Sequence, residues 1–358
     1  MRLPMLSCGP TPQIPRDTPA ERMTTRIGIA TGYDPALDVR DFARTVHEVD
    51  ERGYDIAFFS ETFALMRDSV SAMAAFALVS QRITLGCTQV VRLRSPVTMA
   101  QTLASLDELS GGRMVLCPGA ATTLHARRFG FPPVDPPTAL TEWIDAIRLV
   151  LTGERVSYQG TTVAFEDAEL GWKPLRRHVP LWIAATSATG LRLAGRIGDG
   201  VLLNTVASPE YSANAVRIVR QAAREAGRDQ ATFEVAQLIN TSVEEDHGAA
   251  LDAVRWEVAT KFYPAKFRSQ AAPRLRVGEP WIDPAELPRF EAAFAAGGSE
   301  GLAQAIPPSW IEGLTASGTP DEVVQRVERY REAGVTLPIL RPAARHQTSR
   351  VIDLFAPR

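Results

Sequence analysis

Residues 180–205, PLWIAATSATGLRLAGRIGDGVLLNT, carry the pattern that decides the fold. Residues 181–185 form a short apolar run without alternation, which is typical of a strand buried on both faces of a parallel sheet. Thr186 and Ser187 follow as turn and N-cap residues, because their hydroxyl oxygens can accept hydrogen bonds from free amides of a first helical turn. Apolar residues then recur on one helical face, glycines end the helix, and residues 201–203 begin another apolar strand. The stretch therefore predicts a strand, a turn, a helix and a second strand.

The expected turn at Thr186 and Ser187 is also a candidate anion site. A turn of small residues before a helix exposes backbone N–H groups at the helix N-terminus, where phosphate groups bind. The alternative is an ordinary tight turn that binds nothing, and the local pattern fits both.

The same alternation of strand and helix recurs along the chain. We expect strands at residues 26–31, 54–60, 83–91, 113–117, 181–185, 201–203, 231–240 and 335–340. We expect helices at residues 38–52, 69–80, 96–110, 138–151, 188–197, 209–226, 244–260 and 320–333, with a short last helix at 349–355 and a hairpin at 156–165. Eight such alternations favour an α/β fold of the (β/α)8 TIM-barrel type. A doubly wound open sheet is the alternative, but no GxGxxG motif follows the first strand.

The expected domain organisation is simple. Residues 1–23 hold five prolines and no apolar core of a secretory signal, so we expect a disordered N-terminal extension. Residues 24–358 then form a single barrel domain. Residues 261–311, which contain several prolines, are expected to be an irregular insertion before the last helix and strand.

Charge and composition exclude several classes of partner. The net charge is −2, from 39 basic and 41 acidic residues, and offers no field to attract nucleic acid or an anionic membrane. No apolar run approaches the roughly 18 residues that span a bilayer. Cys8, Cys87 and Cys117 are widely spaced and form no CxxC motif, which indicates a reduced, cytoplasmic protein without disulfides or a zinc site.

In a barrel, the active site lies at the carboxyl ends of the strands. Those ends fall at residues 31–33, 60–63, 86–89, 118–122, 186–188 and 204–205. Glu61 is the only carboxylate directly after a strand, no histidine occupies such a place, and no metal ligands cluster. Strand ends rich in Gly, Ala, Ser and Thr but poor in acids and bases indicate that a cofactor carries the reaction.

Three motifs resemble one family. Residues 94–121, RSPVTMAQTLASLDELSGGRMVLCPGAA, resemble the segment from the third to the fourth strand of the bacterial luciferase-like oxidoreductases. Residues 180–204 resemble the phosphate-binding turn of that family, and residues 318–336, GTPDEVVQRVERYREAGVT, resemble its C-terminal helix and last strand. Within the family, the chain is most similar to the branch that uses the deazaflavin coenzyme F-420 (F420), typified by methylenetetrahydromethanopterin reductase. The resemblance implies a TIM barrel, a homodimer, and a flavin-like ring across the barrel mouth.

The resemblance also implies which residues contact the coenzyme. It makes Ser60 and Glu61 contacts of the coenzyme after the second strand, and it places a non-prolyl cis peptide that supports the ring at Gly86–Cys87 and a coenzyme phosphate at the turn that begins with Thr186. The full set of implied cofactor-binding residues is Ser60, Glu61, Gly86, Cys87, Gly119, Ala120, Ala121, Thr186, Ser187, Ala188 and Asn204.

The implied catalytic positions depart from the family pattern. They are Glu61, Thr62 and Thr122, and the two threonines stand where relatives carry a His and a Glu. These threonines either line the pocket or relay a proton. Glu61 could instead form an ion pair with an arginine such as Arg67. Arg92 and Arg94 could bind an anionic substrate or the coenzyme, or be solvated.

Three functions remain open on this basis. The first is hydride transfer between F420 and a small organic substrate, with reduction of a C=C or C=N bond favoured because threonines replace the usual acid–base residues. The second is an FMN-dependent monooxygenase that works with a separate flavin reductase. The third is a flavin-binding barrel without catalytic activity.

Overall fold

The computed structural model describes residues 26–61, 67–120, 123–230, 232–264, 266–267, 271–343 and 346–357. The expected N-terminal extension, residues 1–23, lies outside the described residues. Among the expected site residues, the same is true of Thr62, Ala121 and Thr122.

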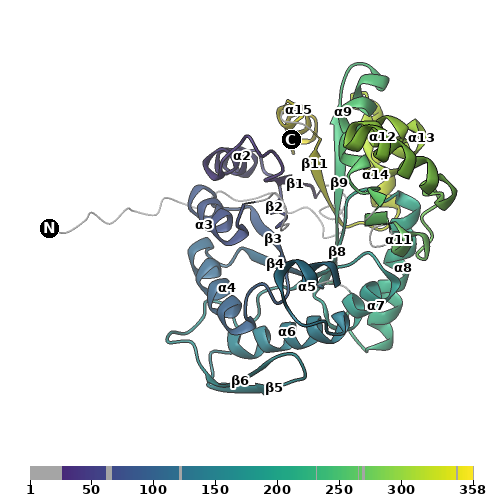
Figure 1. The fold of residues 1–358 in the computed structure, drawn as a ribbon. Coiled ribbons are helices and arrows are strands. Elements are labelled where there is room, and N and C mark those ends of the chain that lie inside the picture. The colour runs from purple at the N-terminus through teal and green to yellow at the C-terminus, as the bar shows by residue number, and fades with distance from the viewer. Residues whose placement is uncertain are drawn as a thin grey trace.

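Eight parallel strands close into a barrel surrounded by helices (Figure 1), which confirms the expected (β/α)8 TIM-barrel fold. The strands are β1 (Gly28–Thr31), β2 (Ile56–Phe59), β3 (Thr84–Val90), β4 (Met114–Gly119), β7 (Trp182–Ala184), β8 (Gly200–Leu203), β9 (Glu234–Val243) and β11 (Leu337–Pro342). The pairing of β11 with both β9 and β1 and the pairing of β8 with β9 complete the circle. A further strand, β10 (Ala316–Gly318), pairs with β9 and was not expected.

The outer layer consists of helices that follow the strands. They are α2 (Val39–Glu51), α3 (Ser69–Val79), α4 (Pro96–Ser110), α5 (Thr123–Phe129), α6 (Pro136–Leu151), α7 (Ala188–Ile197), α8 (Pro209–Glu225), α9 (His247–Ala259), α14 (Pro320–Glu332) and α15 (Gln347–Phe355). A hairpin of β5 (Val156–Gln159) and β6 (Ala164–Ala168) follows α6, as expected. The expected helices did not include α5.

Local sequence signals set the helix boundaries. The Ser95 hydroxyl accepts the Thr98 N–H at 3.1 Å and Pro96 opens α4, while Gly111 ends it at φ +70°. At α14, Thr319 and Glu322 form the capping box that the sequence predicts.

The buried residues form an inner and an outer layer. Side chains that face the barrel lumen include Phe58, Cys117, Leu238 and Ile339, packed as one cluster. Their neighbours along each strand, such as Phe59, pack outward against the helices. Because strand side chains alternate between faces, the next inward positions lie at the carboxyl ends of the strands.

The insertion is helical, so the expectation of an irregular segment at 261–311 is wrong. It forms α11 (Ala272–Leu275), the 3-10 helix η1 (Pro284–Glu286), α12 (Leu287–Ala305) and α13 (Pro308–Leu314). Phe262, Phe290 and Trp310 make its core, with ring centroids 5.1 to 6.3 Å apart. Each of these four helices has a proline in its first two positions, where the missing N–H costs nothing. The prolines that suggested irregular structure therefore begin helices.

The implied cis peptide at Gly86–Cys87 is also wrong, since the described residues contain no cis peptide bond. Gly86 and Cys87 lie inside β3 and pair with Phe58 and Phe59 of β2. Both residues also pair with β4. The strand is therefore regular on both sides, and its peptide bonds are trans.

Candidate active site

The mouth of the barrel is polar where the lumen below it is apolar. The inward faces of β9 and β11 carry apolar residues up to Leu238 and Ile339, and the next inward residues are Asn240 and Arg341. Their exposed fractions are only 1% and 6%. Buried polar side chains at this place indicate a site built for a polar ligand rather than for packing.

Arg341 is the centre of this polar cluster. Its guanidinium carbon lies 3.7 Å from the centroid of the Tyr33 ring, and its Nη2 lies 2.9 Å from Glu257 Oε2. Its Nη1 donates to Asn240 Oδ1 at 3.0 Å. The Tyr33 hydroxyl in turn donates to Ser60 Oγ at 2.6 Å. The cluster thereby joins the ends of β1, β2, β9 and β11 to α9.

Backbone geometry holds Tyr33 at the mouth. Gly32, just after β1, has φ +94°, which favours glycine. A Cβ there would come within 2.2 Å of the Phe59 ring, so the backbone passes directly over that side chain. Tyr33 itself packs against the lumen cluster.

Burial shifts the pKa values of Tyr33 and Lys261. Burial raises the pKa of Tyr33, although Arg341 and the hydrogen bond to Ser60 oppose the shift. For Lys261, burial and then the nearby positive charge of Arg341 lower the pKa to about 7, and Glu257 only partly offsets them. The Tyr33 hydroxyl is therefore a neutral hydrogen-bonding group, whereas Lys261 changes charge near neutrality.

Glu61 points away from this cluster. Its carboxylate accepts hydrogen bonds from the Ser69 N–H at 3.1 Å, the Ser69 hydroxyl at 2.6 Å and the Gln89 amide at 3.2 Å, and it pairs with Arg94 at 3.1 Å. Ser69 is the first residue of α3, so the carboxylate also lies at a helix N-terminus. The ion pair suggested by the sequence exists, but Arg94 rather than Arg67 forms it.

The other two arginines near the third strand have protein partners. Arg67 lies over the Phe42 ring and donates to the Pro35 carbonyl. Arg92 stacks on Phe131 with 4.8 Å between the guanidinium carbon and the ring centroid. These contacts fix the rim on the side of β3.

The residues of β3 and β4 that were expected to contact the coenzyme face different parts of the structure. Gly86 faces the lumen, where a Cβ would come within 2.7 Å of the Phe58 ring, and Cys87 faces outward into the helix layer. Burial raises the pKa of Cys87 to about 12, so its thiol is inert. Gly119 ends β4 with ordinary space beside it, and Ala120 packs against the outer core.

The turn before α7, predicted as a candidate anion site, forms a capped helix N-terminus. Ser187 is the N-cap, and its Oγ accepts the Gly190 N–H at 3.2 Å. The first amides of the helix, including that of Ala188, have no intrahelical acceptor. The Tyr211 hydroxyl fixes the preceding residue by donating to the Thr186 carbonyl at 2.9 Å.

Asn204 lies in a strained turn after β8. Its Oδ1 accepts the Thr205 N–H at 2.8 Å. Val206 has φ +57°, which is unfavourable for a β-branched residue, and buried Arg274 of the insertion donates to the Thr205 carbonyl at 3.1 Å. The insertion therefore helps to hold this side of the mouth.

The structure brings together a different set from the one the sequence singled out. Ser60 belongs to the polar cluster of the mouth, whereas the Glu61 side chain belongs to the outer layer. The residues that sequence reasoning left without a role are Tyr33, Asn240, Glu257, Lys261 and Arg341. Two of them could have been found from the sequence. Asn240 and Arg341 each lie two residues after an inward-facing residue of the same strand, and side chains two residues apart in a strand face the same side.

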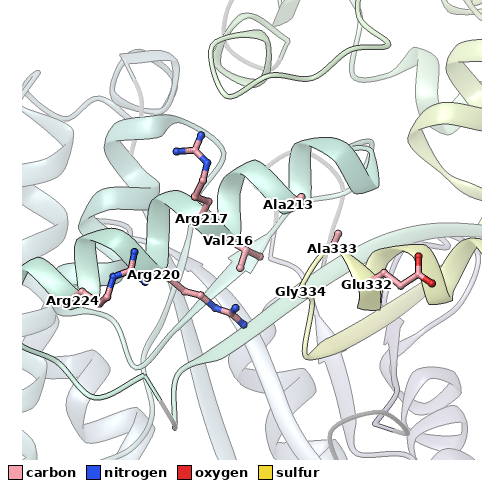
Figure 2. Close-up of a pocket in the computed structure, with 8 residues that line it drawn as sticks. All are labelled: Ala213, Val216, Arg217, Arg220, Arg224, Glu332, Ala333 and Gly334. Carbon is pink, nitrogen blue, oxygen red and sulfur yellow. The ribbon is translucent and has the colours of Figure 1, made fainter.

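Other parts of the described chain are weaker candidates for a functional site than the barrel mouth. A groove of about 340 Å³ lies on the outer surface between α8 and the end of α14, with Arg217, Arg220 and Arg224 on one side and Glu332 on the other (Figure 2). No group of three potential metal ligands occurs among the described residues. Within the same ranges, no helix is long and apolar enough to cross a membrane.

Curated relatives share most of their length with this chain. The 5,10-methylenetetrahydromethanopterin reductase of Methanolobus tindarius is 30% identical over 308 residues, which cover 85% of this chain and 89% of the relative. The enzyme of the same name from Archaeoglobus fulgidus is 29% identical and covers 85% and 90%. An F420-dependent glucose-6-phosphate dehydrogenase of Beutenbergia cavernae is 27% identical and covers 83% and 85%.

Solved structures share the fold. The coenzyme F420-dependent tetrahydromethanopterin reductase of Methanopyrus kandleri superposes with a TM-score of 0.80 at 23% identity, covering 92% of this chain and 97% of that one. An F420-dependent secondary alcohol dehydrogenase, solved with an F420–acetone adduct, gives a TM-score of 0.73 at 21% identity and covers 93% and 96%. The sequence pattern of the luciferase-like monooxygenases matches residues 22–337. Since that match spans most of the sequence, the chain belongs to the luciferase-like monooxygenase family.

Proposed function

We propose that this chain is an F420-dependent oxidoreductase that reduces a C=C or C=N bond of a small organic substrate. The observation that carries the proposal is a helix N-terminus at α7, capped by Ser187, on the same face of the barrel as a buried polar cluster. The relatives named for F420 support this cofactor over FMN.

The residues present fit a phosphate-bearing deazaflavin. The Ser187 oxygen accepts from Gly190, which leaves its O–H to donate outward beside the amides of Ala188 and the next residue. The Tyr211–Thr186 bond fixes the turn in advance of binding. These groups would hold the coenzyme phosphate without any change in the fold.

The mouth fits the polar edge of a flavin-like ring. Asn240 Nδ2 and Arg341 Nε are buried atoms with no hydrogen-bond partner among the described residues. Such atoms are costly unless a ligand or water satisfies them. The coenzyme, when bound, supplies a hydride equivalent, and the protein orients the substrate and excludes water.

Reduction is favoured over dehydrogenation because the described mouth offers no free carboxylate base. Glu257 is paired with Arg341, and Glu61 is paired with Arg94. A dehydrogenation of an alcohol needs a base to accept the hydroxyl proton. A reduction needs a proton donor instead.

Titrating the purified protein with F420 and with FMN, and following the quenching of coenzyme fluorescence, tests this function. Tight F420 binding with weak FMN binding is the expected result. The reverse preference would indicate the FMN-dependent monooxygenase, and binding of neither would indicate a barrel without this activity. The deazaflavin chromophore without its phosphate is the matched control for the α7 site.

A further inference from the structure

The side-chain amide of Asn240 is held in one orientation by its neighbour on the next strand. Asn240 of β9 and Arg341 of β11 are paired in the parallel register of the sheet, where the two strands lie side by side (Figure 1). A guanidinium can only donate hydrogen bonds, so the amide must present its oxygen to it, and Asn240 Oδ1 accepts from Arg341 Nη1 at 3.0 Å. The amide nitrogen, Nδ2, is therefore left for another partner.

The guanidinium that sets this orientation is itself fixed by two other elements. It lies over the ring of Tyr33, which follows β1, with 3.7 Å between the guanidinium carbon and the ring centroid. Its Nη2 lies 2.9 Å from Glu257 Oε2 of α9. The amide of Asn240 is thus oriented before any ligand binds, which avoids the entropy cost of ordering it on binding.

The amide nitrogen of Asn240 is a buried donor without an acceptor. Asn240 is only 1% exposed, and within the described residues its Nδ2 makes no hydrogen bond. Asn240 lies two residues after Leu238, whose side chain packs in the lumen, so the amide faces inward at the level of the mouth. Because a buried donor is costly when it is left unpaired, Nδ2 marks a place for an acceptor atom of a ligand.

The charge behind this donor determines which acceptor it favours. Arg341 polarises the amide through Oδ1, which strengthens Nδ2 as a donor. Glu257 contacts a different nitrogen of the guanidinium, so the positive group rather than the carboxylate is hydrogen-bonded to Asn240. Such a donor stabilises an oxygen that gains negative charge and disfavours a cation.

We propose that the substrate is a conjugated carbonyl compound whose oxygen accepts a hydrogen bond from Asn240 Nδ2, with Arg341 as the residue that positions the amide. This substrate class rests on the proposed reductase function. A hydride adds to the β-carbon of the C=C bond, and the π electron pair moves through the conjugated system to the carbonyl oxygen, which forms an enolate. The α-carbon of the enolate then takes a proton from water. The substrate gains two electrons, and the reduced coenzyme loses them.

The same geometry favours a C=C bond over a C=N bond. A C=N bond accepts a hydride readily when its nitrogen is protonated, and that iminium is a cation. The guanidinium of Arg341, one hydrogen bond behind the donor, opposes a second positive charge but stabilises an enolate. The other unpartnered atom of the mouth, Arg341 Nε, is left for the polar edge of the coenzyme ring.

Binding of para-nitrophenolate to the full-length protein with oxidised F420 tests the assignment without turnover. A phenolate resembles an enolate because its negative charge lies on an oxygen conjugated to carbon, and its absorbance reports how much of the bound probe is ionised. We expect Asn240→Leu to weaken phenolate binding about 10- to 100-fold and to leave the F420 affinity unchanged. For para-nitroanisole, which has the same ring but cannot ionise, the difference should be much smaller.

Two further variants separate the loss of the donor from damage to the fold. Asn240→Asp has the same size and can still pair with Arg341, but its carboxylate repels an oxyanion, so the folded variant should not bind the phenolate. Gln237→Met is the matched control. Gln237 is a buried amide of the same strand that faces outward and accepts a hydrogen bond from Ser212. Its replacement should leave the phenolate affinity unchanged.

The outcomes separate the two proposals. If F420 binds but the phenolate does not, or if Asn240→Leu binds the phenolate as well as the unmodified protein does, the substrate assignment is overturned and the reductase function stands. A loss of F420 affinity in folded Asn240→Leu would place Nδ2 on the coenzyme and would also overturn the assignment. If the unmodified protein binds no F420, the reductase function falls and the substrate assignment falls with it.

Discussion

The guanidinium of Arg341 lies over the ring of Tyr33, with 3.7 Å between its central carbon and the ring centroid. Arg341 comes from the last strand of the barrel and Tyr33 from just after the first, and the pairing of β11 with β1 places them together. The same guanidinium is paired with Glu257. One residue thus connects the closure of the barrel, the edge of the mouth and α9.

Replacing Arg341 with methionine should destabilise the protein by about 3 kcal/mol, because it leaves the mostly buried Glu257 carboxylate without its partner. Urea unfolding measures this loss. The double variant Arg341→Met with Glu257→Gln is the control, since it removes the orphaned charge and should recover part of the stability. A double variant no more stable than the single one would show that the ion pair is not the cause.

The same substitution should raise the pKa of Lys261. Arg341 is the main positive neighbour that lowers this pKa, so its removal favours the ammonium form. Competitive acetylation of Arg341→Met should therefore place the midpoint for Lys261 at a higher pH than in the unmodified protein. An unchanged midpoint would show that Arg341 does not act on Lys261.

Replacing Glu61 with glutamine should lower the free energy of unfolding by about 2 kcal/mol, because the carboxylate accepts from Ser69 and Gln89 and pairs with Arg94. Urea unfolding measures this effect, and F420 titration of the folded variant measures the coenzyme contact implied by the family resemblance. An affinity equal to that of the unmodified protein would remove Glu61 from the coenzyme site. Arg67→Met is the matched control, since Arg67 contacts Phe42 rather than Glu61.

Replacing Ser187 with alanine should weaken F420 binding about 3- to 10-fold, because one hydroxyl donor to the phosphate is lost. The same change removes the α7 N-cap and costs about 1 kcal/mol of stability. The chromophore without its phosphate separates these effects, since its affinity should be the same for both proteins. Equal loss of affinity for both ligands would indicate damage to the barrel rather than to a phosphate site.

Glu142 should make stability depend on acid pH. Burial disfavours its charge, but hydrogen bonds from the Thr162 hydroxyl and from the N–H groups of residues 161–163 outweigh burial and lower the pKa to about 2. Because this folded-state value lies below the ordinary value of 4.5, the ionised carboxylate stabilises the fold above that pH, and its contribution disappears as the pH falls toward 2.

The comparison that measures this effect is Glu142→Gln against the unmodified protein. The variant should be less stable by about 2 kcal/mol at neutral pH, with the difference shrinking steadily between about pH 4.5 and pH 2. Thr162→Val, which removes only the hydroxyl donor, should show a smaller difference of the same form. A constant difference across this range would contradict the assigned cause.

His247 should give a pH dependence of opposite sign. Hydrogen bonds from its ring to Glu322, 2.9 Å away, and to Glu312, 3.2 Å away, raise its pKa above 6.5. The protonated ring therefore stabilises the fold fully below pH 6.5, and this contribution is lost as the pH rises through the raised value. Thermal unfolding of His247→Gln should show a lower midpoint in mildly acidic buffer and little difference at alkaline pH. Glu312→Gln, which removes one of the two carboxylates, should weaken this dependence.

Much of the fold could be predicted because its signals are local. Ser95 and Pro96 begin α4, Thr319 and Glu322 cap α14, and apolar runs without alternation mark the buried strands. The insertion could not be predicted in this way, because prolines occur both in irregular segments and in the first turn of helices. Packing around Phe290 and Trp310 decides between the two.

The candidate site was predictable at the turn before α7 but not at its centre. Ser187 caps the helix in both the prediction and the structure, since an N-cap depends on residues within one turn. Glu61 follows a strand as expected, yet its side chain lies in the outer layer, because the alternation that sends Phe58 inward sends Phe59 and Glu61 outward.

By itself, the sequence determined the order of strands and helices, their caps and the family motifs, because each depends on neighbours a few residues apart. The tertiary structure alone decided which charged groups meet. Closure of the barrel brings Tyr33 from one end of the chain to Arg341 at the other. Burial of charged groups, and contacts between charged groups far apart in the sequence, arise only when the chain folds.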